Sequence, residues 1–517
     1  MCISSTNKQF LSPNKPAMSK VEAATAIGGW RQELKKNMPP KERVAIERVK
    51  MPELAPELRR KNYEEVNSGL THNQAVTEAK RCLDCPKPTC IEGCPVEIDI
   101  PAFIKNIERN EVLIAADILK ETSALPAVCG RVCPQEKQCE ERCVHHKMGK
   151  EPVAIGYLER YAADYAIRNE EREMRNELKK HTHSSLLTPH SSIKIAVAGS
   201  GPAGLSFAGD MAKFGYEVVV FEALHEIGGV LKYGIPEFRL PNAVIDAEIK
   251  NLKELGVKFV TNCIIGKTLT IDDLKNDGFR AVFVASGAGL PNFMRIKGEN
   301  LIGVMSSNEY LTRVNLMGAA REENSTTPVS RGKVVAVIGG GNTAMDSVRT
   351  ALRVGAERAI IVYRRSEEEM PARIEEIKHA KEEGVEFMIL HNPIEYIGDE
   401  KGKVKQMILQ KMELGEPDEK GRRSPKPIPN ATETIDVDVV VVSVGVSPNP
   451  LIPSSVSGLN MSKWGTIVVD DNTLQSSVPM IFAGGDIVRG GATVILAMGD
   501  GRKAAKAMHE KILKGEI

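Results

Sequence analysis

The chain has 517 residues, of which 42% are hydrophobic and 26% are charged, and its length corresponds to about three globular domains. Its formal net charge of +1 argues against a protein that binds nucleic acid or an anionic membrane surface. No apolar run is long enough to cross a bilayer and residues 1–20 lack the apolar core of a secretory signal, so we expect a cytoplasmic protein with reduced cysteines and no disulfide framework.

The N-terminal part of the sequence predicts helices. Residues 1–40 are predicted to be a loose extension, and a charged helical pattern follows over residues 44–79. Two short amphipathic helices are predicted within residues 100–122, and a longer helix over residues 153–175. Two cysteine-rich stretches lie between these helices.

The polar stretch 176–192 is predicted to be a linker between domains. It holds three histidines without the regular spacing of metal ligands, which we interpret as solvated: His181, His183 and His190. Beyond it, seven short β-branched runs alternate with helical patterns, which is typical of parallel sheets covered on both faces by helices. Two of these runs open the same kind of glycine motif, so this part is predicted to hold two nucleotide-binding units.

The first unit reads as a strand, a glycine-rich turn, a helix and a second strand over residues 193–222. The turn comprises Gly199, Gly201, Pro202, Ala203 and Gly204. Its glycines permit a tight turn, the approach of a pyrophosphate and close packing of helix on strand, and the pyrophosphate lies at the positive end of the helix. Glu222 ends the second strand, where a carboxylate binds a ribose 2′-hydroxyl and repels a 2′-phosphate.

The stretch after this acid resembles flavoprotein oxidoreductases, which carry a pair of glycines there. The candidate positions are Gly229, Val230, Leu231 and Arg239. A stretch near the C-terminus resembles the second FAD element of the same proteins. There Asp486, after Gly485, would bind the ribityl chain of the flavin.

In that second element, a helix begins near Ala492, with Thr493 and Val494, and would point its N-terminus at the flavin ring. The resemblance therefore implies FAD at the first site. It also implies a FAD domain that is discontinuous in sequence, over residues 193–289 and 448–517.

The second nucleotide-binding unit is predicted within residues 290–447. Its turn comprises Gly339, Gly341, Asn342, Thr343 and Ala344, and alanine is an accepted variant of the third glycine. The second strand ends in Arg364 and Arg365 instead of an acid. Guanidinium groups pair with phosphate, so this pattern predicts NADPH, with a solvated basic turn neutralised by the following "SEEEM" as the alternative. Arg373 and Gly445 are further candidates for this site.

Eight of the ten cysteines lie between Cys82 and Cys143. They follow the pattern C-x2-C-x4-C-x3-C-P and then C-x3-C-P-x4-C-x3-C. Zinc ribbons usually show two separated CxxC pairs, whereas the Cys-Pro steps here resemble ferredoxin runs. Beyond the linker only Cys263 is present, so electrons cannot leave a flavin through a redox-active disulfide. We therefore expect two [4Fe–4S] clusters as one-electron carriers, with zinc as the alternative.

Several motifs together carry a specific resemblance: the cysteine block, "GSGPAG", "YGIPEFRLP", "GGGNTAMD", "YRRSEEEMPA" and "FAGGDI". Over residues 40–517 the chain resembles the small subunit of NADPH-dependent glutamate synthase. The same module resembles the N-terminal part of dihydropyrimidine dehydrogenase and the large subunit of NADH-dependent ferredoxin:NADP oxidoreductase. The resemblance implies an α/β protein with an α-helical iron–sulfur domain over residues 41–175, followed by two interleaved Rossmann-type domains that bind FAD and NADPH.

The resemblance also implies a set of cluster ligands. In the dihydropyrimidine dehydrogenase pattern the ligands interleave, and the first cluster takes Cys82, Cys85, Cys90 and Cys143. The second takes Cys94, Cys133, Cys139 and a side chain of the helix that begins with "IGxL", which is Glu159 here and a glutamine in that relative. In an all-cysteine scheme Cys129 would be the eighth ligand instead, and both schemes stay open.

The function implied by the resemblance is electron transfer from NADPH to FAD, to the clusters and then to a partner, with no catalytic side chain because hydride passes between bound cofactors. In a glutamate synthase the partner is a large FMN-containing subunit that reduces 2-iminoglutarate to glutamate, and we expect an oligomer. One alternative is the same module in a ferredoxin-linked bifurcating enzyme or a sulfide dehydrogenase. Another is a non-catalytic assembly protein, against which the intact glycines, Glu222 and Asp486 argue.

Overall fold

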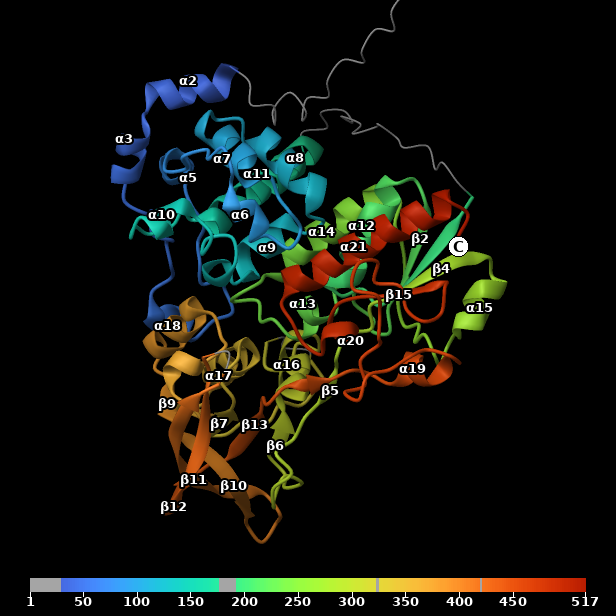
Figure 1. The fold of residues 1–517 in the computed structure, drawn as a ribbon. Coiled ribbons are helices and arrows are strands. Elements are labelled where there is room, and N and C mark those ends of the chain that lie inside the picture. Colours follow the sequence, from blue (N-terminus) through green and yellow to red (C-terminus); the bar gives the residue numbers. More distant parts are fainter. Residues whose placement is uncertain (1–28, 176–191, 322–324, 419–420) are drawn as a thin grey trace, which may run out of the picture.

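The computed structural model describes residues 29–175, 192–321, 325–418 and 421–517 (Figure 1). An all-helical part lies beside two units that are each built on a five-stranded sheet. The predicted linker, apart from residue 192, and residues 1–28 of the predicted extension lie outside the described residues. Among the residues that are described, no helix combines the length and the apolar character needed to span a membrane.

The first helices differ from the sequence prediction. They are α2 (Gly29–Asn37), α3 (Pro40–Ala45), α4 (Pro56–Arg59) and α5 (His72–Lys80). The expectation of a loose extension is wrong for residues 29–40, because Arg31 of α2 is buried and pairs with Asp84 far along the chain. The continuous helical pattern expected over residues 44–79 is also wrong, since Pro52 and Pro56 interrupt it and proline removes a helical hydrogen bond.

The rest of the helical part agrees with the prediction. It comprises α6 (Thr89–Glu92), α7 (Ile100–Glu108), α8 (Val112–Thr122), α9 (Pro126–Val132), a 3-10 turn (Gln135–Lys137), α10 (Val144–Lys147) and α11 (Ile155–Arg175). The two helices predicted within residues 100–122 and the helix over 153–175 are confirmed. A Cβ atom at Gly130 of α9 would lie 2.5 Å from the backbone nitrogen of Arg160, so only glycine lets α9 approach α11 this closely.

The first nucleotide unit is a parallel sheet in the order β15-β4-β1-β2-β3. Its strands are β1 (Lys194–Ala198), β2 (Glu217–Phe221), β3 (Lys258–Val260), β4 (Phe279–Val284) and β15 (Ile481–Ala483). Its helices are α12 (Pro202–Lys213), α13 (Val230–Tyr233), α14 (Asn242–Glu254), α15 (Ile271–Asn276), α19 (Leu451–Ser455), α20 (Asp486–Arg489) and α21 (Val494–Leu513). The C-terminal segment thus returns to a sheet that began nearly 300 residues earlier, as the colours in Figure 1 show.

The second nucleotide unit is a parallel sheet in the order β6-β13-β7-β8-β9. Its strands are β6 (Val304–Ser306), β7 (Val334–Ile338), β8 (Arg358–Tyr363), β9 (Glu386–Ile389) and β13 (Val439–Val442). Its helices are α16 (Ser307–Asn315), α17 (Asn342–Val354), a 3-10 turn (Glu367–Glu369) and α18 (Ile374–Glu382). All seven β-branched runs of the sequence are strands in one of the two sheets, so that prediction is confirmed.

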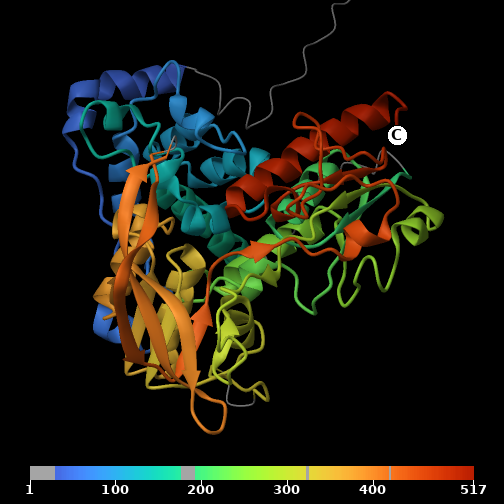
Figure 2. The same cartoon turned by 60° about the horizontal axis from the view of Figure 1, so that its bottom comes forward.

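One face of the second sheet is not covered by helices, in contrast to the prediction. A three-stranded antiparallel sheet lies there, made of β10 (His391–Gly398), β11 (Val404–Pro417) and β12 (Arg423–Asp436), the long orange strands in Figure 2. Tyr396, Met407 and Leu409 of this sheet pack on Ile338 and Ile360 of the parallel sheet. The short pair β5 (Leu290–Pro291) and β14 (Val446–Ser447) marks where the chain crosses between the two nucleotide units.

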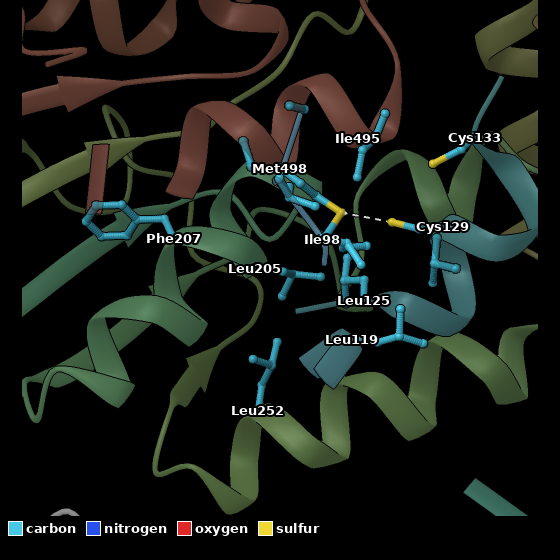
Figure 3. Packing of buried hydrophobic residues seen from close by; sticks show 14 of the residues in the cluster. Ile98, Leu119, Leu125, Cys129, Cys133, Leu205, Phe207, Leu252, Ile495 and Met498 are labelled. Carbon is cyan, nitrogen blue, oxygen red and sulfur yellow. Dashed lines mark hydrogen bonds between the residues drawn. The ribbon is translucent and has the colours of Figure 1, made fainter. Parts of the chain in front are cut away.

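The helical part and the first nucleotide unit share one hydrophobic cluster (Figure 3). Leu119 and Leu125 of the helical part lie in the same cluster as Leu205 and Leu252, and Met498 of α21 reaches Cys129. The helical part is therefore packed against the first unit as one core, which brings its cysteines beside the predicted flavin elements.

Candidate redox cofactor sites

Four cysteines from separate segments line one pocket: Cys82, Cys85, Cys90 and Cys143. The hydroxyl of Thr89 donates to the carbonyl of Arg142 at 2.7 Å and ties two of these segments together. Burial raises the pKa of the Cys90 thiol, and the charges of the three other thiols raise it further. Four thiolates in one largely buried pocket are therefore unfavourable alone, and a bound metal centre would offset their repulsion.

The pocket is held by cations that the sequence analysis did not single out. Arg31 donates from Nε to Asp84 Oδ2 at 3.1 Å, and Lys35 Nζ donates to the carbonyl of Asp84 at 2.7 Å. Lys105, which is buried, donates to the carbonyl of Cys82 at 2.5 Å. Asp84 stands between Cys82 and Cys85, so α2 fixes the loop that carries them. The sequence could not signal this, because the partners are about fifty residues apart.

The second predicted set also converges. Gly156 lets Gln135 pack against the start of α11, because a Cβ atom there would lie 2.2 Å from Gln135 Nε2. This close packing brings the loop of Cys133 and Cys139 to Glu159. Burial raises the thiol pKa of Cys94 and Cys139, and a hydrogen bond with Cys129 raises that of Cys133. The charge of Glu159 raises all three further, so the four groups are neighbours.

Glu159 has the surroundings of a ligand. Its side chain is 6% exposed and Oε1 has no hydrogen-bond partner among the described residues. Burial, together with the charge of Glu248, raises the pKa of Glu159 to about 8. A buried carboxylate with an unpartnered oxygen costs free energy unless it binds a metal or a proton, so the residues fit the implied cluster.

Cys129 borders the same set but has another partner. Its sulfur donates to Met498 Sδ at 3.4 Å, and Figure 3 shows it directed at that residue of α21. A second interaction joins its thiol to that of Cys133, one helical turn further on. The choice between Glu159 and Cys129 as the eighth ligand stays a prediction.

The two cysteine sets are neighbours, and the second lies against the first nucleotide unit. Cys90 of the first set contributes to the raised pKa of Cys139 in the second. A Cβ atom at Gly499 of α21 would lie 2.8 Å from the carbonyl oxygen of Pro95, the residue after Cys94. The second set is thus in contact with the helix that the flavin is predicted to face.

The first glycine turn has the geometry of a pyrophosphate site. Gly199 has φ +111°, and a Cβ atom there would lie 2.4 Å from the carbonyl oxygen of Ala285. A Cβ atom at Gly204 would lie 2.0 Å from the carbonyl oxygen of Gly199. A Cβ atom at Gly201, in contrast, would have no neighbouring atom within 4 Å. Gly201 caps α12, with Pro202 in its first turn and buried Ala203 behind it, so an anion there meets a helix N-terminus.

Glu222 organises this turn from the end of β2. It accepts hydrogen bonds of 2.9 Å from the backbone nitrogens of Ser200 and Leu224. The Ser200 hydroxyl in turn accepts from the nitrogen of Gly228 at 2.9 Å, which brings the glycine pair onto the turn. Gly229, with φ +55°, lies so close that its Cβ atom would be 2.9 Å from Gly201 Cα, and Val230 and Leu231 follow in α13.

The second flavin element joins the same place. A Cβ atom at Gly485 would lie 3.0 Å from the Cβ atom of Ala203. Asp486 Oδ1 accepts from the backbone nitrogen of Ala492 at 3.0 Å, and Thr493 caps α21, which begins at Val494. Burial raises the pKa of Tyr233 to about 12, with further contributions from the charges of Asp486 and Glu222. The structure therefore brings the predicted FAD residues together, with the exception of Arg239.

Arg239 faces the other nucleotide unit. Its Nη1 donates to Asp346 Oδ2 at 2.7 Å, and its Nε lies 3.3 Å from Glu376 Oε1. The side chain is buried, so it forms a bridge between the two units. These contacts give no support to a role of Arg239 at the flavin, and that role stays a prediction.

The second glycine turn repeats the geometry of the first. Gly339 has φ +144°, and a Cβ atom there would lie 2.3 Å from the carbonyl oxygen of Ser443, at the end of β13. Gly445 follows two residues later with φ +105°. Gly341 caps α17, Asn342 and exposed Thr343 begin that helix, and Ala344 is buried.

Arg364 and Arg365 are not neutralised by the acids that follow them. Glu367 pairs with Lys381 at 2.6 Å, and Glu368 and Glu369 pair with Arg423 at 3.0 and 2.6 Å. Within the described ranges neither arginine has an acidic partner, and Arg365 donates only to the carbonyl of Arg423. The alternative of a turn neutralised by "SEEEM" therefore finds no support in these contacts.

A third arginine joins this pair. Burial lowers the pKa of Arg364, and so do the nearby charges of Arg365 and Arg422. Arg422 begins the return of the β11–β12 hairpin, next to Arg423. Among the described residues these three guanidinium groups have no acidic partner, which suits a dianion such as a 2′-phosphate. Sequence reasoning missed Arg422, although the pair of arginines in "GRRSP" was a signal for it.

Arg373 is directed elsewhere. Its guanidinium donates to the carbonyl of Arg131 at 2.7 Å and to Gln135 Oε1 at 2.9 Å, both in the helical part. These contacts lend no support to a phosphate-binding role for this side chain, which stays a prediction.

Two family models match the chain. The model for pyridine nucleotide-disulphide oxidoreductases matches residues 193–501, and the model for dihydropyrimidine dehydrogenase domain II, 4Fe-4S cluster, matches residues 59–171. The junction between the two matches falls in the stretch that was predicted to be a linker.

Relatives align along most of the chain. The glutamate synthase [NADPH] small chain of Escherichia coli is 36% identical over 89% of this chain and 96% of that protein. The corresponding small chain of Azospirillum brasilense is 34% identical over 89% and 94%. The beta subunit of the NADP(+)-dependent formate dehydrogenase of Moorella thermoacetica is 37% identical over 87% of this chain but only 62% of that protein.

Solved structures share the fold of the nucleotide-binding part. Mycobacterium tuberculosis FprA in complex with NADPH superposes with a TM-score of 0.52 over 63% of this chain and 86% of that protein. The sequence identity is 20%, so the likeness concerns the fold alone.

Proposed function

The chain belongs to the family of the NADPH-dependent glutamate synthase small chains, and from that premise we propose that it is the electron-entry subunit of a glutamate synthase. It is an NADPH-dependent oxidoreductase with a 4Fe-4S domain and a pyridine nucleotide-disulphide oxidoreductase fold. The alternative of a non-catalytic assembly protein is therefore wrong. The partner and the number of clusters are part of the proposal.

One observation carries the proposal: residues that border the second cysteine set touch the helix of the second flavin element. Pro95 abuts Gly499, and Cys129 abuts Met498, both on α21. A route from a flavin to Cys94, Cys133 and Cys139 would therefore pass along an apolar cluster, in which Cys133 is buried and the other two are half-buried. Electrons would then pass to the neighbouring first set, whose pocket lies further from α21.

The residues of the chain supply binding, orientation and exclusion of water. The turn at Gly201 and the carboxylate of Glu222 would hold the diphosphate and ribose of FAD, and Asp486 its ribityl chain. The turn at Gly341 and the guanidinium groups of Arg364 and Arg365 would hold NADPH. The thiolates of the two sets, with Glu159, would hold two [4Fe–4S] clusters.

The partner would consume the electrons that this chain takes from NADPH. When bound, FAD would supply the change from two-electron hydride transfer, on the NADPH side, to the one-electron transfer that [4Fe–4S] clusters carry out. In the proposed large subunit, 2-iminoglutarate takes up two electrons and two protons and becomes glutamate.

A second candidate is the same module beside another partner. The similarity to the formate dehydrogenase beta subunit and to the beta subunit of an NADPH-Fe(3+) oxidoreductase of Geobacter sulfurreducens favours this candidate. The chain spans 62% and 65% of the length of those two proteins.

The test is reconstitution with the native partner. The protein purified without oxygen should contain one FAD and about eight irons per chain, and NADPH should bleach its flavin absorption. Glutamate should form from 2-oxoglutarate and glutamine only after the large subunit of the same host is added. Stoichiometric zinc without iron would defeat the cluster proposal. If the loaded protein co-purifies with a different redox protein and makes no glutamate with the large subunit, the second candidate stands.

A further inference from the structure

Arg373 lies between the second glycine turn and a cysteine loop of the helical part. It caps α18, and its backbone nitrogen donates to Asn342 Oδ1 at 2.9 Å. The neighbouring nitrogen of Ala372 donates to the carbonyl of Gly340 at 3.2 Å. The backbone at Arg373 is therefore fixed to the turn that is proposed to hold NADPH.

The side chain of Arg373 reaches the opposite way. Nη1 donates to the carbonyl of Arg131, and Nη2 donates to Gln135 Oε1. These two residues stand two positions before and two positions after Cys133. The side chain is 5% exposed, so the guanidinium is a buried brace on the loop that carries Cys133.

Three carboxylates and one thiol lie around this guanidinium. Glu375 lies 3.0 Å from Nη2, Glu136 lies 3.7 Å from Nε, and Glu376 is nearby. The Cys133 thiol is also close enough to raise the pKa of Arg373, after the larger contributions of burial and of these acids. The side chains of Glu375 and Glu136 are 15% and 24% exposed, so water screens their charges in part. Glu376 is buried, as are Cys133 and Arg373.

We propose that Arg373 is a positioning residue that couples the NADPH site to the cluster at Cys133. It holds the Cys133 loop in place and keeps a fixed positive charge beside that cluster. A positive charge stabilises an added electron, and nearby charge is one of the factors that set cluster potentials. Arg373 is hydrogen-bonded to both sites. A structural change at the glycine turn on nucleotide binding is therefore transmitted to the cluster through this residue.

The coupling is reciprocal. If bound nucleotide changes the reduction potential of the cluster, then reduction of the cluster changes nucleotide affinity by the corresponding factor. The inference rests on the proposed function, since it requires a cluster held by Cys94, Cys133 and Cys139.

The experiment is a redox titration of the intact protein followed by EPR, with and without NADP⁺, on wild type, Arg373→Gln and Arg373→Lys. In Arg373→Gln the midpoint of the second cluster should become lower and that of the first should stay unchanged. NADP⁺ should change the EPR signal of the second cluster in wild type and not in Arg373→Gln. Arg373→Lys keeps the charge, so its midpoint should lie between those of the other two proteins.

The matched control is Arg358→Gln, which removes a guanidinium from the same unit. Arg358 is exposed and pairs with Glu386 at 2.7 Å, and its guanidinium has no hydrogen bond to a cysteine loop among the described residues, so both midpoints should equal those of wild type. The inference is overturned if Arg373→Gln, with full iron content, leaves the second midpoint unchanged or lowers both midpoints equally. If Arg373→Gln loses iron, the response of Arg373→Lys to NADP⁺ decides, because this variant keeps the charge but loses the paired contacts to Arg131 and Gln135: a smaller change of the second cluster's EPR signal supports the inference, and a wild-type response overturns it.

Failure of the proposed function has a different signature. A wild-type protein without a second reducible cluster would contradict the cluster assignment itself. A wild-type protein with two clusters and an unresponsive Arg373→Gln would contradict only the coupling.

Discussion

Arg59 of the helical part and Glu383 of the second nucleotide unit form a buried ion pair, with 3.1 Å between Arg59 Nε and Glu383 Oε1 and 324 residues between them in sequence. Glu383 also accepts from Arg349 and Arg353, at 2.8 and 2.7 Å. One carboxylate thus neutralises guanidinium groups from two parts of the chain, and no water can replace it at full burial.

This relationship predicts a large loss of stability in Glu383→Ala. The substitution leaves buried guanidinium groups without their shared partner, and breaking such a pair costs about 3–5 kcal/mol. Chemical unfolding should show the loss. Glu386→Ala is the matched control, because Glu386 forms an exposed pair with Arg358, and exposed pairs contribute about 0.2–1 kcal/mol. Equal losses in the two variants would contradict the importance of burial here.

The same carboxylate predicts a dependence of stability on pH. Burial alone would raise the pKa of Glu383, but Arg349 and Arg353 lower it from 4.5 to about 2. Since the folded pKa lies below the unfolded one, the stabilisation is complete above pH 4.5 and is lost as the pH falls toward 2, by about 3 kcal/mol at most. The difference in unfolding free energy between wild type and Glu383→Gln should therefore shrink over that range. A difference that stays constant from pH 6 to about 3 would refute the assignment.

The arginine cluster predicts nucleotide preference. Arg364→Ser with Arg365→Ser should raise the KM for NADPH and leave NADH oxidation little changed, because charge-assisted contacts to the 2′-phosphate contribute about 1.5–3 kcal/mol each. Arg422→Ser alone should have a smaller effect in the same direction. Steady-state kinetics with both nucleotides measure this. Arg358→Ser should change neither value. A wild-type protein that prefers NADH would show that the three arginines form only a solvated turn.

Glu159 predicts a defect confined to one cluster. Glu159→Ala should weaken iron retention at the second set, and Glu159→Cys should alter the EPR signal or potential of that cluster, since a thiolate replaces a harder ligand. Both variants should still take hydride from NADPH onto FAD, because the nucleotide sites lie elsewhere. Glu170→Ala is a suitable control, as Glu170 lies on the same helix and is half-exposed. If Glu159→Ala keeps both clusters and Cys129→Ala loses one, the all-cysteine scheme is correct.

The sequence predicted those features that depend on contacts within a few residues, namely the glycine turns and the strands. The glycine turns at Gly199 and Gly339 follow from steric limits within a few residues, and the seven strand runs follow from their β-branched composition. The convergence of the cysteine sets came from a family resemblance, because spacing alone left zinc and other ligand schemes open.

Long-range contacts explain what was missed. The helix at Arg31 depends on Asp84, and the site of Arg422 depends on a hairpin that folds back over the second sheet. The sheet of β10–β12 was missed because β12 alternates exposed and half-buried residues without an apolar run. Arg373 sits in a motif that suggests phosphate binding, and only its partners Arg131 and Gln135 reveal another role.

The shared hydrophobic cluster has a consequence for the order in which the protein is made. The helices around Cys129 are synthesised early, yet the apolar side chains that close over them, including Met498, belong to the last helix of the chain. A ribosome-bound intermediate that lacks α21 therefore exposes one side of the second cysteine set. The proposed cluster would be accessible to iron and sulfide at that stage, and the packing of α21 would then cover that side.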